Sequence, residues 1–104
     1  LLLIESADNY ICVWYADNNA PKKVLVRNTL KQVAEQLAST HIQRCHRSYM
    51  VNFEHIASLR RDNSEISLEF DVKGVSEIPV SKSYTDKIME SFVKYSKQNS
   101  FQLI

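Results

Sequence analysis

The residues best suited to chemistry lie between His41 and Arg61. This span holds four arginines and three histidines, and its only acid is Glu54. Guanidinium groups carry a permanent positive charge and donate hydrogen bonds in a planar fork, so this composition favours the binding of anions such as phosphates. A run of charged residues can also be nothing more than a solvated face of the protein, and that alternative remains open.

Cys45 and His46 are the best candidates for a catalytic pair, because an imidazole can activate a nearby thiol. Neighbouring residues of a strand point to opposite faces, however, so this spacing argues against a contact between the two side chains. No third group that would orient His46 is evident, and a chain with one glycine has no glycine-rich phosphate loop. We therefore expect no catalytic residues and no enzymatic activity.

The two cysteines indicate neither a metal site nor a disulfide. Cys12 and Cys45 stand far apart, without a CxxC motif or histidines at zinc-ligand spacing, so we expect no metal and no cofactor. Two reduced thiols are typical of a cytoplasmic protein. Cys45 follows Arg44 and precedes His46, and nearby cations lower a thiol pKa, which predicts a reactive, redox-sensitive group. The alternative is a buried and inert thiol facing the core.

Length and charge limit the remaining possibilities. A chain of 104 residues corresponds to one domain over 1–104, and its formal net charge of +1 means that an anion site depends on local asymmetry. No apolar run approaches the roughly 20 residues that cross a bilayer, and no signal-peptide pattern is present, so we expect no membrane contact by this domain. Because the chain starts with Leu1-Leu2-Leu3-Ile4, we expect it to be a fragment of a larger protein.

Hydrophobic periodicity and turn residues predict a mostly β domain with one internal helix and one C-terminal helix. The internal helix is expected to start at Asn28 or Thr29, and the terminal one at Ser81 or Ser83. Residues 40–47 are expected to form a loop and 96–104 a flexible tail. The predicted strands cover 1–5, 10–15, 22–27, 48–51, 56–60, 65–70 and 75–80.

Three single residues or patterns carry further structural predictions. Leu30, Val33, Ala34 and Leu37 form one apolar stripe, as on a helix that packs against a core. Asn52 is placed to cap a single helical turn over 53–55. The strand that contains Pro79 is expected to lie at a sheet edge or to end there, because proline has no N–H for the ladder.

Three polar loops between these elements carry side chains that can reach phosphates or the edges of bases. Arginine and asparagine can bind guanine and adenine bidentately, whereas lysine and serine contact phosphates. Each of three candidates also has a structural interpretation without a ligand. Asn9 can serve only the turn, His46 can form a hydrogen bond within its loop, and Lys82 can be a solvent-exposed residue in the first turn of a helix. The candidate binding residues are Asn9 and Tyr10 in the first loop, Arg44, His46 and Arg47 in the second, and Ser81, Lys82 and Ser83 in the third.

Four segments of the chain resemble the LytTR DNA-binding domain, and they occur in the order of that family. The most specific is Arg44-Cys45-His46-Arg47-Ser48-Tyr49-Met50-Val51-Asn52. The others are Ile4-Glu5-Ser6-Ala7-Asp8-Asn9-Tyr10, Arg27-Asn28-Thr29-Leu30 and Val80-Ser81-Lys82-Ser83-Tyr84. In the last segment Lys82 stands where the family more often has arginine.

The resemblance implies an elongated, multi-sheet β fold of short antiparallel strands whose loops enter successive major grooves of promoter DNA. It places the DNA contacts in the Asn9–Tyr10 loop, on Arg47, and on Lys82 with its serine neighbours. The family's usual leading strand before Leu1 is missing. Such domains usually form the C-terminal output domain of response regulators, behind a receiver domain.

We therefore expect a sequence-specific DNA-binding output domain of a bacterial two-component transcriptional regulator in the cytoplasm. The expected partners are double-stranded promoter DNA, an upstream receiver domain in the full-length protein, and a second copy of the chain on DNA. The alternative is a ligand- or protein-binding β module without DNA contact. Salt dependence separates the two, because neutralising phosphates releases counterions and makes affinity fall steeply with salt.

Overall fold

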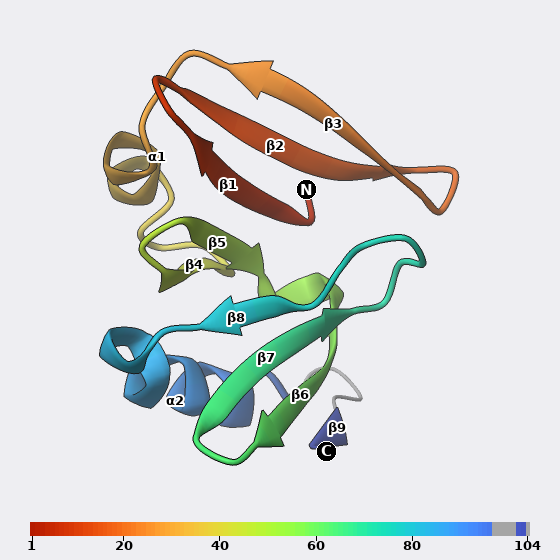
Figure 1. The fold of residues 1–104 in the computed structure, drawn as a ribbon. Coiled ribbons are helices and arrows are strands. Elements are labelled where there is room, and N and C mark those ends of the chain that lie inside the picture. The colour runs from red at the N-terminus through yellow and green to blue at the C-terminus, as the bar shows by residue number, and fades with distance from the viewer. Residues whose placement is uncertain (97–101, 104) are drawn as a thin grey trace.

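The computed structural model describes residues 1–96 and 102–103 of the chain, and these residues form two sheets with two α-helices (Figure 1). The strands are β1 (Leu3–Ala7), β2 (Tyr10–Asp17), β3 (Ala20–Val26), β4 (Ile42–His46), β5 (Tyr49–Asn52), β6 (Ile56–Asp62), β7 (Glu65–Phe70), β8 (Ile78–Val80) and β9 (Gln102–Leu103). The helices are α1 (Leu30–Gln36) and α2 (Thr85–Ser96), and single 3-10 turns form η1 (Phe53–His55) and η2 (Lys82–Tyr84).

The first sheet has the strand order β3-β2-β1-β5-β4, and all its pairs are antiparallel. A tight turn joins β2 to β3 at Asn18 and Asn19, whose φ angles of 54° and 63° suit the twist of a two-residue hairpin. This turn fixes the register in which Ile11 pairs with Val26. Asp8, with a φ of 57°, serves the β1–β2 turn in the same way.

The second sheet has the order β8-β7-β6-β9, with antiparallel pairs except for the parallel pair of β6 with β9. β8 is an edge strand, which confirms the prediction made from Pro79. It covers only Ile78–Val80 and not the predicted 75–80, because the chain from Asp71 to Glu77 forms the loop after β7.

Apolar side chains pack on both faces of the first sheet, although its edge strand β3 is largely exposed. On one face Ile4, Ile11 and Met50 pack against Leu30 and Val33 of α1. On the other face the core lies between the two sheets and α2, whose buried residues include Ile88 and Phe92. The predicted apolar stripe is thus confirmed, and Thr29 caps its helix by accepting a hydrogen bond from the amide of Gln32 at 3.2 Å.

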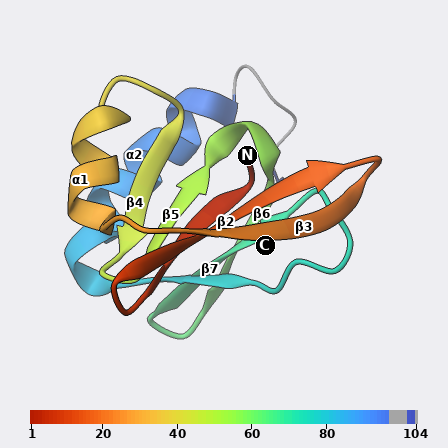
Figure 2. The same cartoon turned by 90° about the horizontal axis from the view of Figure 1, so that it is seen from above.

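The predicted mostly β fold with two helices is confirmed, but three details differ. The expected loop over 40–47 contains the strand β4, which has a bulge between Arg44 and His46. The C-terminal helix begins at Thr85, because the separate turn η2 follows Ser81. The extents of 34 × 33 × 26 Å describe a slightly flattened domain and not an elongated one, since the two sheets are stacked on a shared core (Figures 1 and 2).

Asn52 caps η1 as predicted, since its Oδ1 accepts a hydrogen bond from the amide of Glu54 at 3.0 Å. The predicted flexible tail, 96–104, lies largely outside the described residues. Of that segment the structure describes Ser96 at the end of α2 and the short strand β9 beside β6.

Candidate nucleic-acid interface

The three predicted loops lie side by side at one end of the molecule, at the left of both views (Figures 1 and 2). The β4–β5 hairpin occupies the middle position. On one side the carbonyl of Ser48 accepts a hydrogen bond from the amide of Ser6 at 2.9 Å. On the other side the carbonyl of Cys45 accepts one from the amide of Ser81 at 3.0 Å. Backbone hydrogen bonds therefore hold all three loops together.

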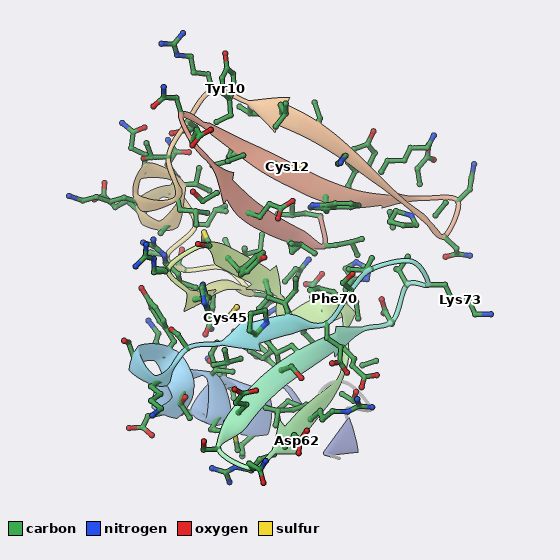
Figure 3. The ribbon with its side chains drawn as sticks, viewed as in Figure 1. Tyr10, Cys12, Cys45, Asp62, Phe70 and Lys73 are labelled. Carbon is green, nitrogen blue, oxygen red and sulfur yellow. The ribbon has the colours of Figure 1, made fainter. Side chains whose placement is uncertain are left out.

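The first loop is the β1–β2 turn, where Asn9 and Tyr10 are both exposed. Figure 3 shows Tyr10 at the end of the hairpin, beyond the core. Asn9 belongs to the turn, as the structural interpretation of this residue predicts, and its side-chain amide is exposed.

The second loop separates its two arginines into different roles. Arg47 is exposed, whereas Arg44 is partly buried and donates a hydrogen bond from one terminal nitrogen to the carbonyl of Arg47 at 2.9 Å. The Nε atom of Arg44 is buried and has no hydrogen-bond partner in the described part of the chain. Arg44 thus spans the hairpin and fixes the backbone of Arg47, while the guanidinium of Arg47 is free to reach a partner.

The structure confirms the loop role of His46, and its role as a DNA contact stays a prediction. Its Nδ1 accepts a hydrogen bond from the amide of Ser48 at 3.1 Å, which is the predicted hydrogen bond within the loop. In the neutral ring this leaves the proton on Nε2, so Nε2 is the donor available for an external contact. The ring also lies tilted against Tyr49, with 5.4 Å between ring centroids, and this packing fixes its orientation.

The prediction of a reactive Cys45 is wrong, and the buried alternative holds. The side chain is fully buried, and its sulfur lies 3.8 Å from the carbonyl oxygen of Tyr49 and 3.7 Å from that of Pro79. Burial in these apolar surroundings raises the pKa of the Cys45 thiol to about 12. The flanking cations do not lower the pKa of this thiol, because Cys45 faces the core between the sheets.

The third loop runs from β8 into η2, with Lys82 and Ser83 exposed and Ser81 partly buried. The carbonyl of Ser81 accepts hydrogen bonds from the amide of Tyr84 at 3.0 Å and from the hydroxyl of Thr85 at 3.2 Å. Since the amide of Ser81 is bound to Cys45, Ser81 is an anchor of the loop. Lys82 is the exposed charged residue of this loop.

The cationic span 41–61 does not form one patch. Only Arg44, His46 and Arg47 lie at the loop end, and three of the other four basic residues of the span pair with acids, whereas Arg61 is exposed and forms no salt bridge among the described residues. Arg60 contacts Glu69 and Glu77, each at 3.2 Å, while His41 pairs with Glu54 at 2.6 Å and His55 with Asp71 at 3.2 Å. Most of the charged residues between His41 and Arg61 therefore belong to an ordinary solvent-exposed surface and not to one anion-binding site.

Arg27 is an exposed cation of the same end that the sequence interpretation did not assign as a contact. It follows Val26, which pairs with Ile11, so Arg27 lies beside Tyr10. Arg27, Arg47 and Lys82 form no salt bridge within the described residues. The signal that could have identified Arg27 is the tight Asn18–Asn19 turn, because that turn fixes the hairpin register.

The described residues contain no cluster of three or more histidine, cysteine or acidic side chains suited to a metal ion. No helix among them is long and apolar enough to cross a membrane.

Comparison with known proteins agrees with this arrangement. The family model of the LytTr DNA-binding domain matches residues 1–92. A solved LytTr DNA-binding domain, from a Bacillus cereus protein described as a methyl-accepting/DNA response regulator, superposes with a TM-score of 0.72. The two are 25% identical, and the match covers 88% of this chain and 80% of that one. No curated protein matches the chain.

The chain is therefore a DNA-binding domain of mostly β structure that presents its polar loops at one end. It belongs to the LytTR family, in agreement with the resemblance found in its sequence motifs. The model of this family describes a DNA-binding domain.

Proposed function

We propose that this domain reads promoter DNA in a sequence-specific manner by inserting its three loops into successive major grooves. The observation that supports this proposal is the pair of backbone hydrogen bonds, Ser6 to Ser48 and Ser81 to Cys45, that ties the loops together. Loops held in one fixed arrangement can present Arg47 and its neighbours to DNA without first paying the entropy of ordering.

We assign different kinds of contact to the residues of this end. Arg47 contacts a base edge, because it is exposed and its backbone is fixed by Arg44. Lys82 contacts a phosphate, with Ser83 beside it. Asn9 and Tyr10 contact the neighbouring groove. Arg44, Ser81 and the Nδ1 side of His46 position the loops.

The wider setting follows from the family and is part of the same proposal. The domain acts in the bacterial cytoplasm as the output domain of a two-component response regulator, and phosphorylation of an upstream receiver domain controls it. Two copies bind neighbouring half-sites on one operator. DNase footprinting on the selected operator tests the binding of two copies. Protection of two equal half-sites supports it, and protection of a single half-site contradicts it.

The test of base reading begins with selection of an operator from a random DNA library. Arg47→Ala is then compared with Lys73→Ala, which removes an exposed cation at the opposite side of the molecule (Figure 3). We expect Arg47→Ala to cost about 1–3 kcal/mol on the operator, to relax preference at one base pair, and to weaken random DNA much less. Lys73→Ala should change neither affinity.

Two outcomes contradict the proposal at different levels. Equal losses on operator and random DNA would make Arg47 a phosphate contact. Failure to enrich any sequence, together with affinity that does not depend on salt, would favour a ligand- or protein-binding β module in place of a DNA reader.

A further inference from the structure

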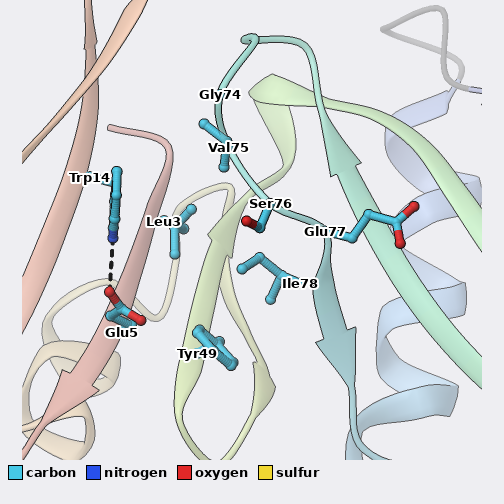
Figure 4. A pocket seen from close by; sticks show the side chains of 9 residues that line it. All are labelled: Leu3, Glu5, Trp14, Tyr49, Gly74, Val75, Ser76, Glu77 and Ile78. Atoms are coloured by element: carbon cyan, nitrogen blue, oxygen red, sulfur yellow. Dashed lines mark hydrogen bonds between the residues drawn. The ribbon is translucent and has the colours of Figure 1, made fainter.

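A cavity of about 210 Å³ lies between the first sheet and the loop that joins β7 to β8 (Figure 4). It has no assigned role in the binding of DNA. Its apolar lining comes from Leu3, Trp14, Tyr49, Val75 and Ile78. This volume is below the roughly 300–1,000 Å³ of drug-sized pockets, so the cavity suits a smaller molecule.

Glu5 supplies the negative charge of the cavity. Its Oε1 accepts a hydrogen bond from the indole Nε1 of Trp14 at 3.0 Å, and its carboxylate also accepts one from the thiol of Cys12, so two contacts fix the carboxylate. Glu77 also borders the cavity, but its carboxylate is bound to Arg60 at 3.2 Å and points away in Figure 4. No lysine or arginine is among the described residues that line the cavity. The carboxylate of Glu5, which forms no salt bridge among the described residues, therefore borders a cavity whose other lining includes five apolar or aromatic side chains.

This combination selects for a particular charge and shape. An ammonium group can donate to the carboxylate of Glu5 in a charge-assisted hydrogen bond. An apolar body of the same molecule can pack on Trp14 and the aliphatic side chains, and the indole ring attracts cations as well. Trp14 already lies near one ammonium, that of Lys23, at 5.3 Å from the ring centroid. An anion of the same size would be repelled by the carboxylate of Glu5, and Lys23, which lies over the indole ring of Trp14, is not among the lining residues.

We propose that this cavity binds a small primary amine with an apolar or aromatic body. The inference rests on the cavity alone and does not depend on the proposed function. A chain that binds the amine but fails to enrich DNA, or the reverse, would therefore separate the two proposals.

Phenethylamine is the probe, and 2-phenylethanol and 3-phenylpropionate are its neutral and anionic counterparts of similar shape. Trp14 is the single tryptophan of the chain, so its fluorescence reports binding at the cavity. We expect the amine to bind about tenfold more tightly than the alcohol, because hydrogen bonds to charged groups are stronger than neutral ones. The anion should not bind measurably.

Three variants test the assignment to Glu5. Glu5→Gln keeps an oxygen that can accept from Trp14 but removes the charge, so the amine should bind only as well as the alcohol. Glu77→Gln is the matched control and should change neither affinity. Ser76→Phe, at an exposed position of the lining, should fill the cavity and abolish binding of both probes. Circular dichroism confirms that each variant is folded.

Several results would overturn the inference. Equal affinity for all three probes would mean a non-selective apolar surface. An unchanged amine affinity in Glu5→Gln would remove the carboxylate from the site. A lack of any saturable response to phenethylamine in the wild-type chain would show that the cavity is not a site for amines.

Discussion

Replacing Cys45 with serine tests how the hairpin that carries Arg47 is held on the core. The thiol is fully buried, and its pKa is raised from 9.0 to about 12. Below pH 9 the thiol is neutral in both the folded and the unfolded chain, and its full stabilising effect is present. Between pH 9 and 12 the unfolded chain releases this proton while the folded chain keeps it. The free energy of unfolding therefore falls as the pH rises through this window.

The size of the effect follows from the shift. One pKa unit corresponds to about 1.4 kcal/mol, so the Cys45 thiol lowers the free energy of unfolding by about 1.4 kcal/mol between pH 8 and pH 10. Cys45→Ser lacks this ionisation. All other ionisable groups are the same in the two proteins, so their effects cancel in the comparison.

Urea unfolding of both proteins at pH 8 and pH 10, followed by circular dichroism, measures the difference. The wild-type chain should lose about 1.4 kcal/mol more than Cys45→Ser over this interval. Maleimide labelling gives an independent reading, since a pKa of about 12 makes the thiolate about a thousandfold rarer at pH 8 than in the unfolded chain. Labelling of Cys45 should therefore require denaturant.

An equal loss of stability in the two proteins would refute this reasoning. It would mean that Cys45 ionises as easily in the folded chain as in the unfolded one. Rapid labelling of the native protein would lead to the same conclusion and would restore a redox-sensitive role for the loop.

Three further predictions concern the loops and the core. Lys82→Ala should weaken all DNA sequences about alike and lower the salt slope by about one, whereas a changed sequence preference with the same slope would make Lys82 a base reader. Gly74→Ala should lower the free energy of unfolding, measured by urea denaturation, by about 1–3 kcal/mol. Gly74 has a φ of 92°, and an added Cβ would lie 3.2 Å from Pro21. An unchanged free energy of unfolding would contradict this loop geometry. Asn52→Ala should cost about 1–3 kcal/mol in the same assay, since Asn52 is 7% exposed and its side chain bonds two backbone groups. No loss would show that water replaces these bonds.

The parts of the fold that the sequence predicts well are those decided by local patterns. The stripe from Leu30 to Leu37 has helical spacing and Thr29 before it, and both determine α1 without any tertiary contact. Asn52 and Pro79 are similar cases. A capping side chain and a missing N–H act over a few residues, so their effects can be read from the chain alone.

The strand β4 could not be predicted because its pattern is irregular. The bulge between Arg44 and His46 interrupts the alternation of inward and outward residues, and the strand is otherwise polar except for Ile42 and Cys45. The partners of Arg60 and His55 were hidden for another reason. Their acids, including Glu69 and Asp71, come from other segments that only the folded sheets bring near.

The placement of Arg47 depends on residues that need not touch DNA. Gln43 accepts a hydrogen bond from the hydroxyl of Ser91 at 2.5 Å, which joins β4 to α2. Together with the buried Cys45 and the bond between Ser6 and Ser48, this contact fixes the hairpin from three directions. A substitution at Ser91 can therefore weaken operator binding by displacing Arg47. Because it removes no phosphate contact, it should leave the salt slope unchanged, and the slope thus distinguishes a positioning residue from a phosphate-contacting one.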